Sequence, residues 1–142
     1  MRTLATLVLL ALAGCDSAGL DGAGLAVYLT AANYTSGSES PVTIANETDR
    51  PVYIHQCGGR AVLFLERRGA DDSWRIIGGP NAICSDAEDQ FPFRLDEGEA
   101  QTVSFFAPYP GEYRLRTTYG FTADFYAFSE TATSETFEVR NR

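Results

Sequence analysis

Histidine and cysteine, the side chains that most often bind metals or act as nucleophiles, are scarce in this 142-residue chain. His55 is the only histidine, and the cysteines other than Cys15 are Cys57 and Cys84. In an extended segment His55 and Cys57 point to the same side. Together with Cys84 and a carboxylate such as Asp86 they form a candidate zinc or copper site. A blue-copper site is excluded, because it needs two histidines and usually a methionine, and the only methionine is the first residue.

Other catalytic patterns are missing. The sequence has neither a Gly-x-Ser-x-Gly motif nor a glycine-rich phosphate loop. Glu97 and Glu99 are best interpreted as turn residues, although a pair of carboxylates is what a glycosidase requires. Asp86, Glu88 and Asp89 are typical of a solvated acidic loop, since the glycine and the spacing of a calcium-binding loop are absent. We therefore expect no enzymatic activity and no cofactor.

The charge of the chain excludes one class of partner. Nineteen acidic residues outnumber eleven basic ones, which gives a net charge of −8 and an isoelectric point near 4.5. An acidic surface repels phosphate backbones, so nucleic-acid binding is not expected. All eleven basic residues are arginines, which indicates either a GC-rich genome or a surface adapted to salt.

The first fifteen residues have the layout of an export signal. Arg2 provides a positive start, and residues 4–13 form an apolar stretch that is too short to span a bilayer. The stretch ends in Leu12-Ala13-Gly14-Cys15, which resembles the lipobox of bacterial lipoproteins at all four positions. The resemblance implies that the Cys15 thiol receives a diacylglycerol, that cleavage follows Gly14, and that the new amino group is acylated. An ordinary secretory signal with a chance cysteine is the alternative.

Three segments follow from this signal. Residues 1–14 are predicted to be the signal peptide and residues 15–24 the lipidated cysteine with a flexible, glycine-rich tether. The tether reaches at most ~30 Å when extended. Residues 25–142 are predicted to form one folded domain. The protein is expected in the bacterial cell envelope, held to a membrane through Cys15 and facing the periplasm or the exterior.

Export also bears on the two remaining cysteines. Two cysteines in an exported chain usually pair, so a Cys57–Cys84 disulfide is predicted. It would close a loop of 27 residues, which the chain-entropy model values at roughly 3.5 kcal/mol.

The body of the chain is a series of short segments rich in β-branched and aromatic residues, separated by turn residues. No convincing helical periodicity follows residue 24. In residues 100–106 Val103 and Phe105 share one face, and in residues 112–118 Tyr113 and Leu115 point inward while Arg114 and Arg116 point outward. In residues 133–140 Phe137 and Val139 are the apolar face. About seven to nine such strands predict an all-β, antiparallel β-sandwich of immunoglobulin-like type.

Three stretches carry a family resemblance: residues 42–52, residues 95–99 with the strand after them, and residues 110–115. In this order they resemble immunoglobulin-like bacterial domains, including the intracellular proteinase inhibitor family. Gly111 and Tyr113 look like a tyrosine corner, in which the phenol bonds to the backbone of the preceding turn. The resemblance covers residues 41–118 and no inhibitory residue can be matched. Trp74, 17 residues after Cys57, is expected to pack beside the disulfide.

Residues 119–128 contain five aromatic side chains in ten residues, namely Tyr119, Phe121, Phe125, Tyr126 and Phe128. One interpretation is a strand pair whose rings fill the open end of the sandwich. The other is an exposed aromatic loop that contacts a partner, because aromatic residues are enriched in interface cores. Phe125 and Tyr126 are adjacent and would point to opposite faces of an extended strand.

The sequence therefore predicts a membrane-anchored envelope lipoprotein that acts as a non-catalytic binding module for a protein or glycan of the envelope. A proteinase inhibitor is one alternative. The other is a small metal-binding lipoprotein that uses His55, Cys57 and Cys84.

Overall fold

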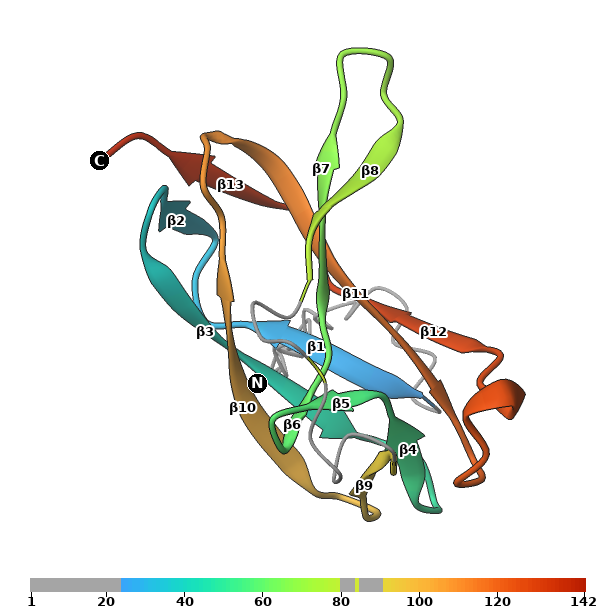
Figure 1. Cartoon of the computed structure of the whole chain (residues 1–142). Helices are drawn as coiled ribbons and strands as arrows, with labels where there is room; N and C mark the ends of the chain where they lie inside the picture. Colours follow the sequence, from blue (N-terminus) through green and yellow to red (C-terminus); the bar gives the residue numbers. More distant parts are fainter. Residues whose placement is uncertain (1–23, 80–83, 85–90) are drawn as a thin grey trace, which may run out of the picture.

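The computed structural model describes residues 24–79, 84 and 91–142, and within these residues the fold is all-β (Figure 1). No helix in these ranges has the length and apolar character needed to cross a membrane. The signal segment, Cys15 and most of the tether lie outside the described residues. The strands are β1 (Leu25–Leu29), β2 (Asn33–Thr35), β3 (Glu39–Asn46), β4 (Val52–Ile54), β5 (Gln56–Cys57), β6 (Arg60–Ala61), β7 (Phe64–Arg68), β8 (Trp74–Gly78), β9 (Phe93–Leu95), β10 (Ala100–Phe106), β11 (Gly111–Gly120), β12 (Glu130–Thr133) and β13 (Phe137–Arg140).

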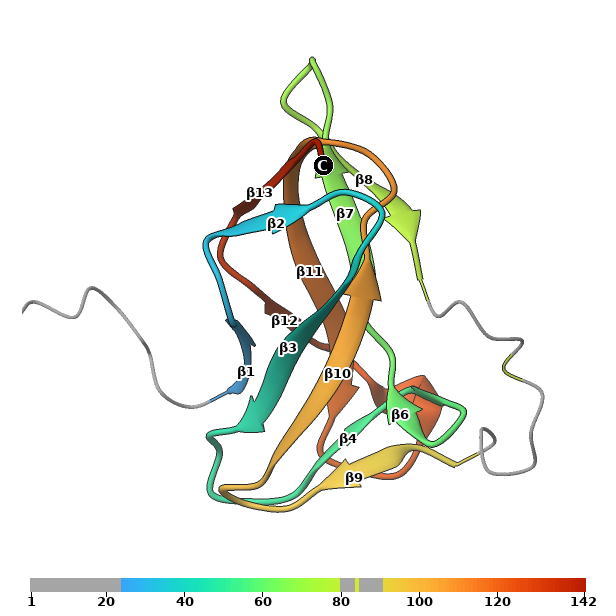
Figure 2. The same cartoon turned by 90° about the vertical axis from the view of Figure 1, so that its left-hand side faces the viewer.

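Two sheets face each other and confirm the predicted β-sandwich. One sheet has the order β1-β3-β10, and the other is built around β11, which pairs with β4, β7, β12 and β13. Figure 2 shows β3 and β10 in front of β7 and β11. Nearly all pairs are antiparallel, and the exception is the parallel pair of β2 with β13.

Alternation along the strands builds the core. Val103 and Phe105 of β10 are buried, as are Tyr113 and Leu115 of β11 and Val139 of β13. Successive side chains of a strand point to opposite faces, so these residues of the two sheets meet between them. Each apolar side chain that leaves water in this way stabilises the fold by about 1.5–3 kcal/mol. The predicted inward and outward positions of residues 112–118 are confirmed.

The tyrosine corner is present. The Tyr113 hydroxyl donates a hydrogen bond of 2.7 Å to the carbonyl oxygen of Tyr109, and the Tyr113 side chain is fully buried. Gly111 has a φ of 151°, and a Cβ atom there would approach Arg67 Nε to 2.7 Å. Glycine therefore leaves room for the Arg67 guanidinium, whose Nη2 donates to the Pro110 carbonyl at 2.8 Å. The corner and the two facing sheets identify the sandwich as immunoglobulin-like.

A buried carboxylate organises the outer face of the β11 sheet. Glu66 of β7 lies opposite Arg114 of β11, and its side chain is only 4% exposed. Arg114 Nε is 2.6 Å from one Glu66 carboxylate oxygen and Arg116 Nη1 is 3.2 Å from the other. The Arg114 guanidinium carbon lies 4.4 Å from the centre of the Trp74 ring. The contact that the structure gives Trp74 is thus with Arg114 on this face, not with the disulfide.

The turn after β3 is closed by a buried asparagine. The side-chain nitrogen Nδ2 of Asn46 donates to the backbone carbonyls of Arg50 and Leu95 at 2.9 and 3.0 Å. Its side-chain oxygen accepts from both the amide and the hydroxyl of Thr48. Asn46 is 1% exposed and Thr48 is 7% exposed. Because every polar group of the Asn46 side chain is paired, the turn is fixed, and with it the position of Arg50.

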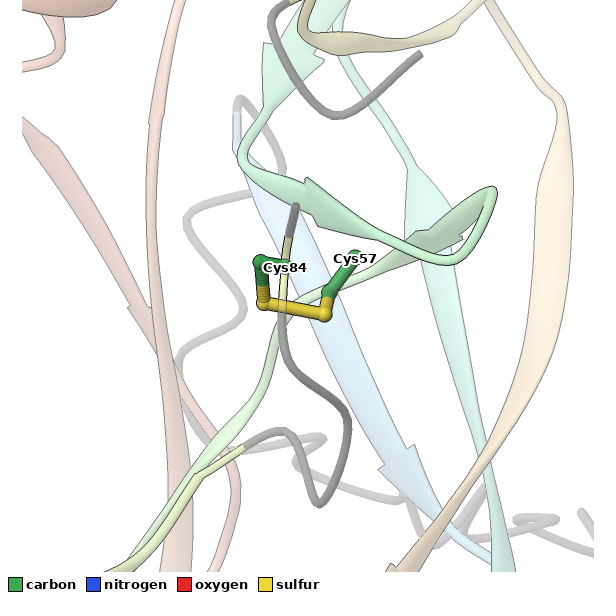
Figure 3. Close-up of a disulfide and its surroundings, with 2 residues drawn as sticks. All are labelled: Cys57 and Cys84. Atoms are coloured by element: carbon green, nitrogen blue, oxygen red, sulfur yellow. A yellow bond between two sulfur atoms is a disulfide. The ribbon is translucent and has the colours of Figure 1, made fainter. Parts of the chain in front are cut away.

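The Cys57–Cys84 disulfide is present, as predicted (Figure 3). Cys57 ends β5 and is followed by Gly58 and Gly59, whose φ angles are +58° and +73°. Two successive residues with positive φ form the two-residue turn that suits a tight hairpin, and this turn leads into β6. Glycine adopts positive φ without steric cost, so this pair of glycines favours the turn.

The described residues contain more strands than the seven to nine predicted. The extra ones are short: β2, β5 and β6 have only two or three residues each. The strand predicted over residues 133–140 begins only at Phe137, as β13, whereas Thr133 is the last residue of the separate strand β12. The strand pair considered for residues 119–128 is replaced by the end of β11, a loop and the 3-10 helix η2 (Phe125–Ala127).

Candidate interaction site

The five aromatic residues predicted to contact a partner lie in different environments. Tyr119 is 5% exposed and belongs to the core. Phe121, Phe125 and Phe128 are partly buried, whereas Tyr126 is fully exposed. We call the last four residues, together with His55 and Arg50, the aromatic end. Its loop follows β11 and contains the orange 3-10 turn of Figure 1.

His55 is the centre of the aromatic end. It lies between β4 and β5, and its ring stacks on Phe125 with 5.0 Å between centroids and an angle of 6° between planes. The ring of Phe128 meets the same imidazole edge-on at 4.8 Å. Phe125 and Phe128 are 5.6 Å apart. Three rings from two distant segments therefore hold the loop in one position, in arrangements that aromatic pairs favour.

The 3-10 helix turns Tyr126 away from this cluster. The Asp124 carboxylate accepts a 3.0 Å hydrogen bond from the Tyr126 amide and so caps the helix. The Ala127 amide donates to the Asp124 carbonyl at 3.0 Å. Phe125 and Tyr126 do point to different sides, as their adjacency suggested, but within a helical turn and not within a strand. Tyr126 is thus fully exposed, and hydrogen bonds within the 3-10 turn hold its backbone in place.

Gly120 is required for this arrangement. A Cβ atom at position 120 would lie 2.7 Å from Cδ1 of Phe128 and 3.3 Å from its Cε1. These distances are closer than van der Waals contact, so any larger residue at position 120 would displace the Phe128 ring. Glycine at the end of β11 therefore lets Phe128 fold back over the strand and reach His55.

Arg50 packs against the loop through Phe121. Its guanidinium carbon lies 3.6 Å from the centre of the Phe121 ring, a cation–π contact. Phe121 also meets Tyr119 edge-on at 5.8 Å. The Tyr119 hydroxyl accepts a hydrogen bond from the Leu25 amide at 3.4 Å. The aromatic end is therefore joined through Tyr119 to the first residue of β1.

Burial lowers the pKa of His55 below its ordinary value of 6.5. Partial removal from water disfavours the charged imidazolium, so the ring is neutral near pH 7. A neutral imidazole between phenyl rings extends an apolar platform. With the Tyr126 hydroxyl as its polar tip, this platform suits stacking and hydrogen bonding to a partner.

In the described residues the candidate metal site is not assembled. Cys57 and Cys84 are joined in a disulfide, and His55 is stacked on Phe125. Within the described ranges no three His, Cys, Asp or Glu side chains gather into a group that could hold a metal ion. Asp86, Glu88 and Asp89 lie outside the described residues. Glu99 belongs to the turn before β10, where its amide donates to the Asp96 carbonyl, as its interpretation as a turn residue required.

Comparisons with known proteins add little to this picture. No protein-family model and no curated protein sequence matches the chain. Among solved structures it is similar to the ASH/PapD-like domain 7 of human CEP192, with 15% sequence identity. The match covers 100% of this chain and 96% of that chain, with a TM-score of 0.37. At this score the fold assignment rests on the strand pairing described above.

Two functional elements of the aromatic end escaped the sequence analysis. From the sequence His55 is considered only as a candidate metal ligand, and nothing in the sequence indicates its stack on Phe125, 70 positions later. The role of Gly120 was also missed. A glycine between two aromatic residues, Tyr119 and Phe121, is the signal that could have indicated a close approach at this point.

Proposed function

We propose that the chain is a membrane-anchored envelope lipoprotein whose folded domain binds a protein or glycan without catalysing a reaction. The observation that carries the proposal is the fully exposed Tyr126 on the braced cluster of His55, Phe125 and Phe128. Rigid aromatic side chains that are already ordered lose little conformational freedom on binding, which is why they dominate many interfaces.

The anchor is part of the same proposal. The lipobox-like Leu12-Ala13-Gly14-Cys15 supports lipidation at Cys15, and the disulfide is typical of proteins in an oxidising compartment. The contact of Leu25 with Tyr119 supports a further detail. Leu25 is the first residue of β1, and its amide bonds to the Tyr119 hydroxyl. With the proposed tether before Leu25, the partner would be met close to the membrane.

Crosslinking and capture from native membranes test the binding function. The chain carries a C-terminal tag, and Tyr126→Ala is compared with Tyr109→Ala, which removes another exposed tyrosine outside the aromatic end. We expect the wild type and Tyr109→Ala to capture the same partner and Tyr126→Ala to lose it at least tenfold. Equal capture by all three variants would remove the aromatic end from the proposal.

The anchor has its own test. Mass spectrometry of the mature chain should show an acylated N-terminal Cys15, and Cys15→Ser should release the protein from membranes. An unmodified Cys15 in a membrane-free protein contradicts the lipoprotein assignment and leaves the binding function untouched.

A further inference from the structure

A second surface, which Tyr126 does not line, lies on the flank of the sandwich. We propose that the groove between the edge of β10 and strands β7 and β8 binds an extended peptide strand of a partner. This peptide pairs with the free edge of β10 and carries an acidic residue at one end and a basic residue at the other.

Only alternate residues of β10 form backbone hydrogen bonds to β3, and the other residues direct their backbone groups to the opposite edge of β10. The Glu99 and Ala107 carbonyls both accept bonds from the β3 side, from the Asn46 and Gly37 amides. Alternate residues of a strand direct their backbone groups to the same side. Odd-numbered residues of β10 therefore bond to β3, and Thr102, Ser104 and Phe106 direct their backbone groups outward. β10 is at the end of its sheet order, so no described strand pairs with that edge.

The groove beside this edge has the size and lining of a binding site. Its volume is about 310 Å³, at the lower end of the range for ligand clefts. Ser104 and Phe106 line one wall, and Leu63 and Leu65 line the floor. Gly78 forms part of the opposite wall. An incoming strand would thus place alternate apolar side chains in the groove while its backbone pairs with β10.

The two ends of the groove carry opposite charges. Glu39 lies opposite Phe106 in the β3–β10 register, and Arg60 precedes Ala61, whose amide donates to the Gln101 side chain. Both side chains line the groove, are exposed, and take part in none of the salt bridges of the described residues. Five residues of strand separate the two ends, or roughly 16 Å.

This charge arrangement selects the partner. A basic side chain near Glu39 and an acidic one near Arg60 each gain an ion pair, whereas the reversed order places like charges together. The occupant is therefore a strand-forming peptide segment with a base and an acid about six residues apart and apolar residues between them. Six is the even spacing next to the five residues that separate the two ends, and an even spacing keeps both charged side chains on one face. In an antiparallel pairing with β10 the basic residue comes first.

NMR titration of the full-length chain tests the proposal. The probe is a seven-residue peptide, blocked at both ends, with lysine first, glutamate last and alternating valine and threonine between. We expect the amides of Thr102, Ser104 and Phe106 to shift and to exchange more slowly with solvent when the peptide binds. Absence of these changes at millimolar peptide overturns the proposal, as does prior protection of the same amides in a dimer of the free chain.

Two sets of variants sharpen the test. Ser104→Pro removes an outward amide and no bond to β3, and should weaken binding about tenfold, whereas Ser104→Ala keeps the amide and should bind normally. The double variant Glu39→Lys with Arg60→Glu should prefer a probe with its two charges exchanged. It leaves the backbone intact, so its result stands even if the proline variant fails to fold.

Either double-variant result decides the question. A preference that stays unchanged rejects the role of the two charges and with it the proposed partner. Tyr126→Ala should bind the probe as the wild type does, so failure of the flank groove and failure of the aromatic end can be distinguished.

Discussion

Two aromatic clusters of this domain have similar ring spacing and very different burial. Tyr34, Phe105, Tyr113 and Phe137 lie between the sheets with centroids 5.1–6.0 Å apart. In the aromatic end, the rings of His55, Phe125 and Phe128 are 4.8–5.6 Å apart. The first four side chains are at most 8% exposed, whereas the second cluster lies at the surface beside the fully exposed Tyr126.

Ring contacts alone do not show the role of an aromatic cluster. The free energy of a buried ring comes mainly from its removal from water and from the cavity that its loss would leave. A partly exposed ring contributes less to folding but remains available to a partner. We expect the buried cluster to determine stability and, under the proposed function, the surface cluster to serve recognition. Four substitutions test this division.

The largest effect is expected at the centre of the buried cluster. Phe137 is 2% exposed and contacts the rings of Tyr34, Phe105 and Tyr113. Phe137→Ala should lower the free energy of unfolding by about 3–5 kcal/mol, because it opens a cavity between the sheets. Urea denaturation measures this change. A loss no greater than that of Phe125→Ala would contradict the division between the clusters.

The tyrosine corner gives the next largest effect. Tyr113→Phe removes the hydroxyl that bonds to the Tyr109 carbonyl and keeps the ring. The expected loss of unfolding free energy is about 1.5 kcal/mol, the upper range for one hydrogen bond. Partner capture should not change. A variant that folds normally but no longer binds would show that the tyrosine corner and the aromatic end are coupled.

Phe125→Ala should cost about 1 kcal/mol, since this ring is only partly buried and its removal opens no cavity between the sheets. It also exposes His55, so the imidazole pKa, which burial holds below 6.5, should rise toward that value. Because the folded-state pKa is lowered, the stability that the neutral ring contributes is complete above pH 6.5. It is lost as the pH falls through the folded-state pKa.

Imidazole NMR titration measures the pKa, and denaturation at pH 7 and pH 5 measures the linkage. The variant should lose less stability between these two pH values than the wild type does. An unchanged His55 pKa in Phe125→Ala would show that the stack does not shield the imidazole.

Tyr126→Ala is expected to have the smallest effect on stability, within about 0.5 kcal/mol, because its side chain is fully exposed. The same variant is predicted to lose partner capture. A thermal melt that drops by several degrees would instead assign Tyr126 a structural role.

The sequence predicted the parts of the fold that depend on local pattern. Alternation in residues 100–106 and 112–118 identified β10 and β11 with the correct faces, and Gly111 with Tyr113 indicated the corner. The Cys57–Cys84 disulfide was predicted because the chain carries a predicted export signal and only two cysteines besides Cys15. The strands and the corner can be predicted from neighbouring residues, and the disulfide can be predicted because only one pair of cysteines remains.

The parts that were missed depend on contacts between distant segments. β2 consists of three residues with no distinctive pattern, and it exists because the Tyr34 ring enters the core while its backbone pairs with β13. The stack of His55 on Phe125 joins residues 70 positions apart. The free edge of β10 becomes visible only when the order of strands in its sheet is known.

The hydrogen bond between the Leu25 amide and the Tyr119 hydroxyl has a mechanical consequence. It joins the first residue of β1 to the strand end that carries the aromatic loop. The proposed function, with an anchor before Leu25 and a partner at Tyr126, would apply a pulling force at two places on the domain. This hydrogen bond and the contact between Tyr119 and Phe121 connect those two places directly.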